Sequence, residues 1–191
     1  LIHRSASKYD VLPANSDLTM AEVKLLRMTN RETRLKNSLE TVTDRYDFVM
    51  IDCPPALNIL TLNALVASDS LIIPLQCEYY ALEGLSGLLN TVDQVKQSIN
   101  PKLEIQGILR TMYDGRNRLS LEVSEQLLSH FGDRVYRTVI PRNVRLAEAP
   151  SHGKAVMHYD RRSYGSMAYL ALAGEVIRRQ KVLEAEHLKN R

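Results

Sequence analysis

The sequence has few cysteines and no long apolar run, and each absence excludes a class of protein. Its 191 residues include only two cysteines, Cys53 and Cys77. A structural zinc site needs about four closely spaced ligands, so we predict no such site and interpret both cysteines as small buried hydrophobic residues. No apolar stretch reaches the roughly 20 residues that span a bilayer. No signal peptide is recognisable either, so we expect a cytoplasmic protein.

The residues that are present suit a single globular domain with an uneven distribution of charge. The chain is 45% hydrophobic and 25% charged, which predicts one domain over residues 1–191 with a charged tail over residues 181–191. Residues 1–109 carry 10 Lys and Arg against 13 Asp and Glu, whereas residues 110–191 carry 15 against 9. The basic half is equally consistent with a polyanionic partner and with a solvated surface.

Apolar segments alternate with amphipathic segments along the chain. Apolar segments predict strands over residues 9–12, 46–51, 70–75, 103–112 and 135–140. The continuous apolar character of residues 46–51 predicts a strand that is covered on both faces, and residues 70–75 are predicted to form the next buried strand. Helical spacing and capping residues predict helices from Thr19 onward and over residues 32–43, 59–67, 81–99, 119–131 and 163–188. This alternation predicts an α/β fold, a doubly wound and mostly parallel sheet with helices on both faces.

Asp52 is the residue whose position points most directly to chemistry. It follows four apolar residues at the predicted carboxyl end of a strand, where open α/β sheets bind their ligands. A carboxylate there can hold Mg²⁺ through water while phosphates fill other positions, which is the arrangement of a Walker B strand. Taken alone, an aspartate after an apolar strand is more often a turn or capping residue.

Four segments together resemble the ParA/Soj-type partition ATPases, which are relatives of MinD. In chain order they are YDFVMIDCPPALNILTLNAL, IPLQCEYYALEGLSGLL, GILRTMYDGRNRLSLEV and VIPRNVRLAEAPSHGKAVMHYD. The resemblance covers residues 9–179 and implies a P-loop NTPase-like fold. It further implies an ATPase that uses ATP and Mg²⁺, forms a homodimer in the ATP state and binds DNA non-specifically. A ParB-type centromere-binding protein is the implied partner, and the nucleoid is the implied location.

The resemblance assigns roles around the nucleotide to five residues. Asp52 matches the Walker B aspartate, which would bind Mg²⁺ directly or through water and support the attacking water. Pro141, Arg142 and Asn143 match the loop that frames the adenine. Met112 follows a neighbouring strand and either packs on the base or is an ordinary hydrophobic residue at a strand end.

The resemblance also assigns DNA contacts to two arginines. Arg116 and Arg145 match arginines that the family uses for DNA, although without the resemblance each would be interpreted as a solvated surface residue. Phosphate contacts of this kind hold DNA without reading its sequence. Four further basic residues extend the candidate surface: Arg118, Lys154, Arg161 and Arg162.

One part of the family's pattern is absent from this sequence. The family binds phosphates with a glycine-rich turn that carries two lysines, and no glycine-rich turn followed by Lys and Ser or Thr occurs in the 191 residues. The aspartate of the family's first switch segment is missing too. We therefore expect the family's first strand and phosphate-binding loop to be absent, and these 191 residues alone neither to bind ATP tightly nor to hydrolyse it.

Three functional interpretations follow. The first is a partition ATPase for a chromosome, a plasmid or a protein cargo. The second is a nucleotide-independent module for DNA binding or dimerisation, which has lost ATPase activity. The third is a MinD-like membrane ATPase, which is disfavoured because residues 181–191 lack a broad apolar face, so no membrane contact is expected.

Overall fold

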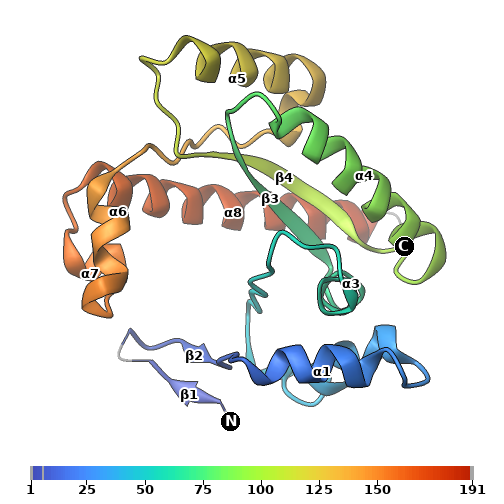
Figure 1. The fold of residues 1–191 in the computed structure, drawn as a ribbon. Coiled ribbons are helices and arrows are strands. Elements are labelled where there is room, and N and C mark those ends of the chain that lie inside the picture. The colour runs from blue at the N-terminus through green and yellow to red at the C-terminus, as the bar shows by residue number, and fades with distance from the viewer. Residues whose placement is uncertain (1, 6, 190–191) are drawn as a thin grey trace. The chain divides into compact units, whose positions relative to one another are not determined.

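The structure is a computed structural model that describes residues 2–5 and 7–189 (Figure 1). Its contacts divide the chain into two compact units. Unit 1 contains the chain up to Ser68 together with Gln97–Pro101, and unit 2 contains Asp69–Lys96 and the chain from Lys102 onward. In the described part of the chain, no helix has the length and apolar character needed to cross a membrane.

Unit 1 is mostly helical and contains one short antiparallel ladder. Its elements are β1 (His3–Arg4), β2 (Asp10–Val11), α1 (Asp17–Leu25), η1 (Arg31–Thr33), α2 (Arg34–Leu39), η2 (Thr43–Arg45) and α3 (Ile59–Ala67). Helix α3 has the predicted bounds, and side-chain amides secure both of its ends. Asn58 Oδ1 accepts from Leu60 N and Thr61 N at 3.1 Å, and Asn100 Nδ2 donates to the carbonyls of Leu65 and Ser68 at 2.9 and 2.8 Å.

The predicted start of the first helix is wrong. Helix α1 begins at Asp17, so Thr19 lies within the first helical turn and forms no capping box. Asn15 Oδ1 accepts a hydrogen bond from Asp17 N at 2.9 Å, which turns the chain before Thr19 is reached. The second helix was predicted over residues 32–43. It is shorter in the structure, where α2 covers Arg34–Leu39.

The strand predicted over residues 46–51 is also wrong. These residues belong to no β-ladder, and the side chains of Phe48 and Met50 are 51% and 76% exposed. A strand forms only where a neighbouring strand satisfies its N–H and C=O groups, and no described segment pairs with these residues. Asp52 therefore follows an exposed apolar segment, and its role in binding Mg²⁺ stays a prediction.

Unit 2 contains the parallel sheet. Its elements are β3 (Ser70–Gln76), α4 (Ala81–Ser98, whose last two residues belong to unit 1), β4 (Glu104–Thr111), α5 (Arg118–Phe131), η3 (Gly132–Arg134), α6 (Val144–Glu148), η4 (Ala149–His152), α7 (Val156–Tyr159) and α8 (Tyr164–Lys189). Strands β3 and β4 pair in parallel from Ser70 opposite Glu104 to Gln76 opposite Thr111, with one bulge in the ladder. The α/β fold class with a parallel sheet is confirmed.

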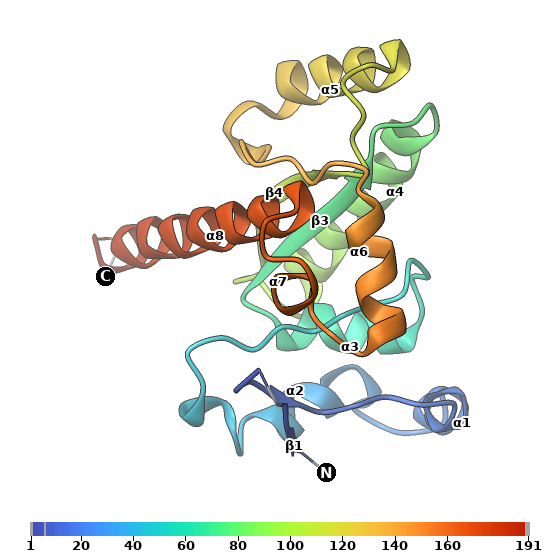
Figure 2. The ribbon, with the colours of Figure 1, turned by 90° about the vertical axis from the view of Figure 1, so that its left-hand side faces the viewer.

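Side chains alternate between two apolar layers on the faces of this sheet. Ile73, Leu75 and Ile108 lie in one cluster with Leu85 of α4 and Leu127 of α5. Leu109 lies on the other face, in a second cluster with Tyr136 and Ile140 that packs against α8. Figures 1 and 2 show α8 along one face of β3 and β4 and α4 along the other. The prediction that helices cover both faces is confirmed for unit 2.

The two cysteines differ in their surroundings. Cys77 is 3% exposed and lies in the cluster between the sheet, α4 and α5, which confirms the prediction that it is a buried hydrophobic residue. Cys53 is exposed, so the same prediction is wrong for it. It follows the exposed apolar segment described above, and the missing ladder there leaves the thiol without cover.

The strand predicted over residues 135–140 is wrong, because the structure forms no strand element there and only Val135 makes an isolated bridge. One bridge, between Val135 and Ile108, joins this segment to β4, and the N–H groups of Tyr136 and Ile140 donate to carbonyls of β4 at 2.9 Å. Between these two residues, the N–H groups of Arg137 and Thr138 donate instead to the two carboxylate oxygens of Glu175 on α8, each at 2.9 Å. A side chain of α8 therefore replaces part of the ladder.

Candidate functional site

The structure brings together the candidate residues for the adenine. Tyr113 N donates to Ile140 O, and Arg142 N donates to Tyr113 O, both at 3.1 Å. These two bonds hold the loop after β4 beside Pro141, so Met112 and the Pro141–Asn143 loop lie next to each other at the carboxyl end of β4. Ligands bind at such ends in open α/β sheets.

Met112 combines an unusual backbone with an exposed side chain. Its φ of 47° lies in the left-handed region that residues other than glycine rarely adopt. Its side chain is 43% exposed, so it is not buried in the core as an ordinary strand-end hydrophobic residue would be. Backbone strain of this kind is concentrated at functional sites, which favours a ligand contact for Met112.

Asn143 has a local structural role. Its Oδ1 accepts from Arg145 N at 3.1 Å, which makes it the N-cap of α6. One lone pair of the side-chain oxygen is therefore used within the chain, and the side-chain NH₂ group could donate to a base. The adenine role of Pro141, Arg142 and Asn143 stays a prediction.

Arg116 lies on the loop between β4 and α5 and forms a bidentate ion pair. Its Nε donates to Asp114 Oδ1 at 3.0 Å, and its Nη2 donates to Asp114 Oδ2 at 3.1 Å. The arginine side chain is 92% exposed. These hydrogen bonds hold the pKa of the Asp114 carboxyl below its usual range, so the carboxylate stays ionised at neutral pH.

Arg145 lies on α6 and is paired with two carboxylates. Its Nη1 donates to Glu148 Oε2 at 2.8 Å, and its Nε lies 3.4 Å from Asp160 Oδ2. The Tyr159 hydroxyl also donates to Glu148 Oε2, at 3.2 Å. The hydrogen bond from Arg145 holds the pKa of Glu148 below its usual value. Arg145 is half exposed, so its guanidinium remains open to solvent on one side.

Further basic residues of unit 2 are exposed as well. We define the basic surface as these residues together with the two arginines above: Arg116, Arg118, Arg142, Arg145, Lys154, Arg161 and Arg162. All seven side chains are open to solvent, so their charges can act on a polyanion. These positive charges therefore lie at the surface, where Arg116, Arg118 and Arg145 are also paired with carboxylates.

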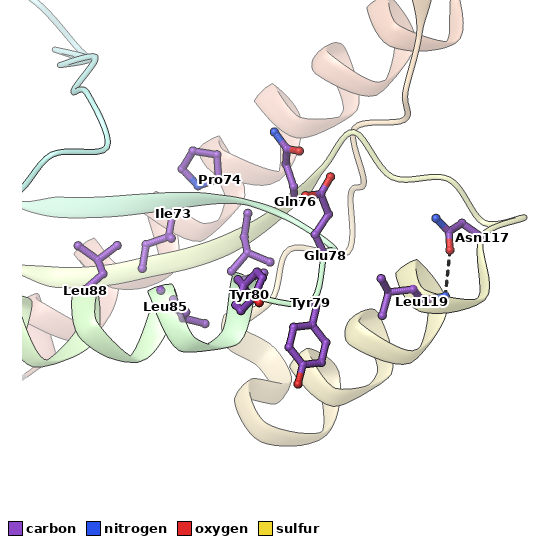
Figure 3. A pocket seen from close by; sticks show the side chains of 13 residues that line it. Ile73, Pro74, Gln76, Glu78, Tyr79, Tyr80, Leu85, Leu88, Asn117 and Leu119 are labelled. Atoms are coloured by element: carbon purple, nitrogen blue, oxygen red, sulfur yellow. Dashed lines mark hydrogen bonds between the residues drawn. The ribbon is translucent and has the colours of Figure 1, made fainter.

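A hollow that the sequence did not indicate lies at the carboxyl end of β3. It has a volume of about 780 Å³ and is lined by β3, the following loop, α4 and the start of α5 (Figure 3). Tyr79 and Tyr80 stand at its edge with their rings 5.1 Å apart, both more than 70% exposed. Asn117, whose Oδ1 accepts from Leu119 N at 3.0 Å, is one of its polar groups. The rule that ligands bind at strand carboxyl ends is the signal that could have located it.

Asp52 belongs to unit 1 and is exposed. No group of three or more metal-binding side chains occurs in the described part of the chain. Magnesium bound with a nucleotide often takes one or two carboxylates, and phosphates and waters supply its other ligands. Asp52 can provide one carboxylate, but the sequence has no glycine-rich turn to hold the phosphates. The residues present therefore do not by themselves fit a complete Mg²⁺–ATP site.

The fold and the comparisons first define a class. The family model described as "AAA domain" matches residues 1–105. Among solved structures, cobyrinic acid a,c-diamide synthase from Mycobacterium smegmatis with bound ATP analog and magnesium superposes with a TM-score of 0.79 at 36% identity. The match covers 94% of this chain and 66% of that one. The class is therefore an α/β fold of the P-loop NTPase type.

Sequence comparison defines the family within this class. The chain is 57% identical over 167 residues to the sporulation initiation inhibitor protein Soj of Bacillus subtilis, covering 87% of this chain and 66% of Soj. It is 51% identical over 179 residues to the chromosome partitioning protein ParA of Caulobacter vibrioides, covering 93% and 67%. The chain belongs to the ParA/Soj family of partition ATPases, and it spans about two thirds of the length of these relatives.

Proposed function

We propose that this chain acts in chromosome partitioning as part of an ATPase that binds DNA non-specifically and forms a homodimer with ATP. The observation that carries the proposal is the exposed basic surface of unit 2, in a chain that is 57% identical to Soj. Residues 1–191 would act as one domain near the nucleoid, with a ParB-type protein as partner. Plasmid or protein cargo is the alternative to a chromosome.

The basic surface suits phosphates rather than bases. Its two candidate DNA-binding arginines, Arg116 and Arg145, lie on the β4–α5 loop and on the short helix α6, so no long helix presents this pair to a groove. Arginine side chains on loops contact phosphates regardless of sequence, and each contact releases counterions. Binding that falls steeply with salt and is similar for unrelated DNA sequences is therefore expected.

Removal of the two candidate arginines tests the DNA part of the proposal. Arg116→Ala combined with Arg145→Ala is expected to weaken binding to a random DNA duplex about tenfold or more at moderate salt. The slope of log K against log salt should become shallower by about 2, since two phosphate contacts are lost. Fluorescence anisotropy over a salt series measures both quantities.

The matched control removes two cations from unit 1. Lys24→Ala combined with Arg27→Ala gives the same change in net charge, and both residues are exposed. This control should keep the slope of the parent chain. If both double variants weaken binding equally, only net charge matters and the assignment of Arg116 and Arg145 is contradicted.

For ATP hydrolysis, we expect no activity from the 191 residues alone. Because the sequence has no glycine-rich phosphate loop, purified chain with ATP and Mg²⁺ should release phosphate no faster than buffer. Asp52→Ala should change nothing. Turnover by the purified chain that is abolished by Asp52→Ala would contradict this expectation and place a complete catalytic site within these residues.

A nucleotide-independent DNA-binding and dimerisation module is the second candidate function. The observation that favours it is the same missing phosphate loop. The DNA-binding experiment repeated with and without ATP and Mg²⁺ tests the module. Both candidates predict equal affinity for these 191 residues, because neither expects them to bind ATP tightly, whereas tighter binding with ATP would contradict the module.

A further inference from the structure

Both candidate DNA-binding arginines are already engaged by carboxylates of the same unit. Asp114 occupies Nε and Nη2 of Arg116, which together form one edge of its guanidinium. Glu148 and Asp160 flank Arg145 at Nη1 and Nε, respectively. A phosphate binds a guanidinium best through two parallel hydrogen bonds to one edge. A DNA phosphate would therefore approach groups that a carboxylate holds.

Additional hydrogen bonds fix these carboxylates in place. Asp114 Oδ1 also accepts from the backbone N–H of Arg116 at 3.1 Å, so the acid belongs to a turn as well as to the ion pair. Glu148 also accepts from the hydroxyl of Tyr159, whose ring stacks on His152 at 4.8 Å. Each carboxylate therefore has a second hydrogen-bond partner, and its lowered pKa keeps a negative charge next to the arginine.

We propose that Asp114 and Glu148 set the strength of DNA binding by competing with DNA phosphates for Arg116 and Arg145. This inference rests on the proposed function, because it requires that the two arginines contact DNA. Each acid neutralises its arginine in the free protein and repels a phosphate that replaces it. Non-specific binding is thereby kept weak and quickly reversible, which suits a protein that must leave DNA again.

The expected effect is moderate because the ion pairs are solvent-exposed. Pairs of this kind stabilise a protein only weakly, so phosphates can displace the carboxylates and the acids tune binding without blocking it. Removing one acid should tighten DNA binding about two- to fivefold. The salt slope should become steeper by up to about 1 for each arginine that is freed.

Asp114→Asn, Glu148→Gln and the double variant test the inference in the 191-residue chain. Both substitutions keep the shape of the side chain, and the amide oxygen introduced at position 114 can still accept from the backbone N–H of Arg116. The expected result is tighter binding to random duplex DNA and a steeper salt slope, with nearly additive effects in the double variant. Asp93→Asn on α4, an exposed residue, is the control for the same change in net charge.

The outcomes separate the inference from the proposed function. If the parent chain binds DNA and both acid variants bind with the same or lower affinity, the inference is overturned and the proposed function stands. Weakening in particular would mean that the acids orient the arginines rather than compete for them. An equal gain with Asp93→Asn also overturns it, because general charge then explains the effect. If neither the parent nor the double variant binds DNA at any salt concentration, both proposals fail.

Discussion

Glu175→Gln is expected to lower the free energy of unfolding by about 3 kcal/mol, because this carboxylate is a buried acceptor for three donors. Its Oε1 accepts from Arg137 N and from Arg179 Nη2, and its Oε2 accepts from Thr138 N. Glu175 is 7% exposed, so water cannot replace these bonds. A glutamine has only one acceptor oxygen and would turn its NH₂ group toward a backbone N–H group.

The same change should reach the candidate functional site. Glu175 holds the chain just before Ile140, and the Pro141–Asn143 loop follows directly. Arg179 supports the same segment, because its Nη2 donates to Val135 O at 2.9 Å. Loss of the carboxylate should therefore loosen the loop that leads to Arg145. We therefore expect the Glu175→Gln variant to bind DNA more weakly than the parent chain even at a temperature where the variant is fully folded.

The pH dependence of stability gives a second readout for Glu175. Burial alone would raise the pKa of this carboxyl, but the N–H groups of Thr138 and Arg137 and the Arg179 guanidinium outweigh it, and the pKa is lowered from its ordinary 4.5. The stabilisation is therefore present above pH 4.5 and is lost as the pH falls through the lower pKa of the folded state. Glu175→Gln should lack this acid-side loss.

Urea unfolding at neutral pH and at about pH 3 measures both effects. Glu125→Gln, an exposed glutamate on α5, is the matched control and should change the free energy of unfolding by less than about 0.5 kcal/mol. A Glu175→Gln variant that is as stable as this control at neutral pH would contradict the role assigned to the carboxylate.

The elements that could be predicted are those whose signals are local. The apolar runs of β3 and β4 and the apolar stripes of α4 and α5 determine their own structure, and all four agree with prediction to within about two residues. Residues 46–51 have the same kind of apolar run, but a strand also needs a partner, and the pattern alone does not supply one. The short helices between residues 144 and 159 are too brief to show a helical period.

Contacts in the candidate site likewise differ in whether local sequence spacing could have predicted them. Glu148 lies three residues after Arg145, a spacing from which pairing on a helix could have been expected. Asp114 lies two residues before Arg116 in a loop, where no helical spacing predicts the pair. Contacts with Glu175 join residues 37 and 38 positions apart, and no local pattern predicts them. The left-handed backbone of Met112 was likewise not predictable, since methionine rarely adopts it.

Gly107→Ala is expected to destabilise unit 2 by about 3 kcal/mol or more, because the added methyl group has no space. A Cβ atom at Gly107 would lie 2.6 Å from Cε2 of Tyr136 and 2.9 Å from the carbonyl oxygen of Arg134. Neither group can easily move. The Tyr136 ring is fully buried, its hydroxyl donates to Gln106 Oε1 at 2.6 Å, and the Arg179 guanidinium lies 4.2 Å from the ring centre.

The clash involves two neighbours, the Tyr136 ring and the Arg134 carbonyl, and a double-mutant cycle separates their contributions. Gly87→Ala on α4 meets no atom within 4 Å and should stabilise the chain by up to about 1 kcal/mol, since alanine favours a helix. In the Tyr136→Leu background, the cost of Gly107→Ala should fall by about 1 kcal/mol or more, because the nearest clashing atoms are gone. Thermal and urea unfolding of the four variants in this cycle give the coupling. If Gly107→Ala costs as much with leucine at position 136 as with tyrosine, the backbone carbonyl of Arg134 is the limiting contact. The glycine would then be required by the approach of the chain to β4, and not by the ring that packs on it.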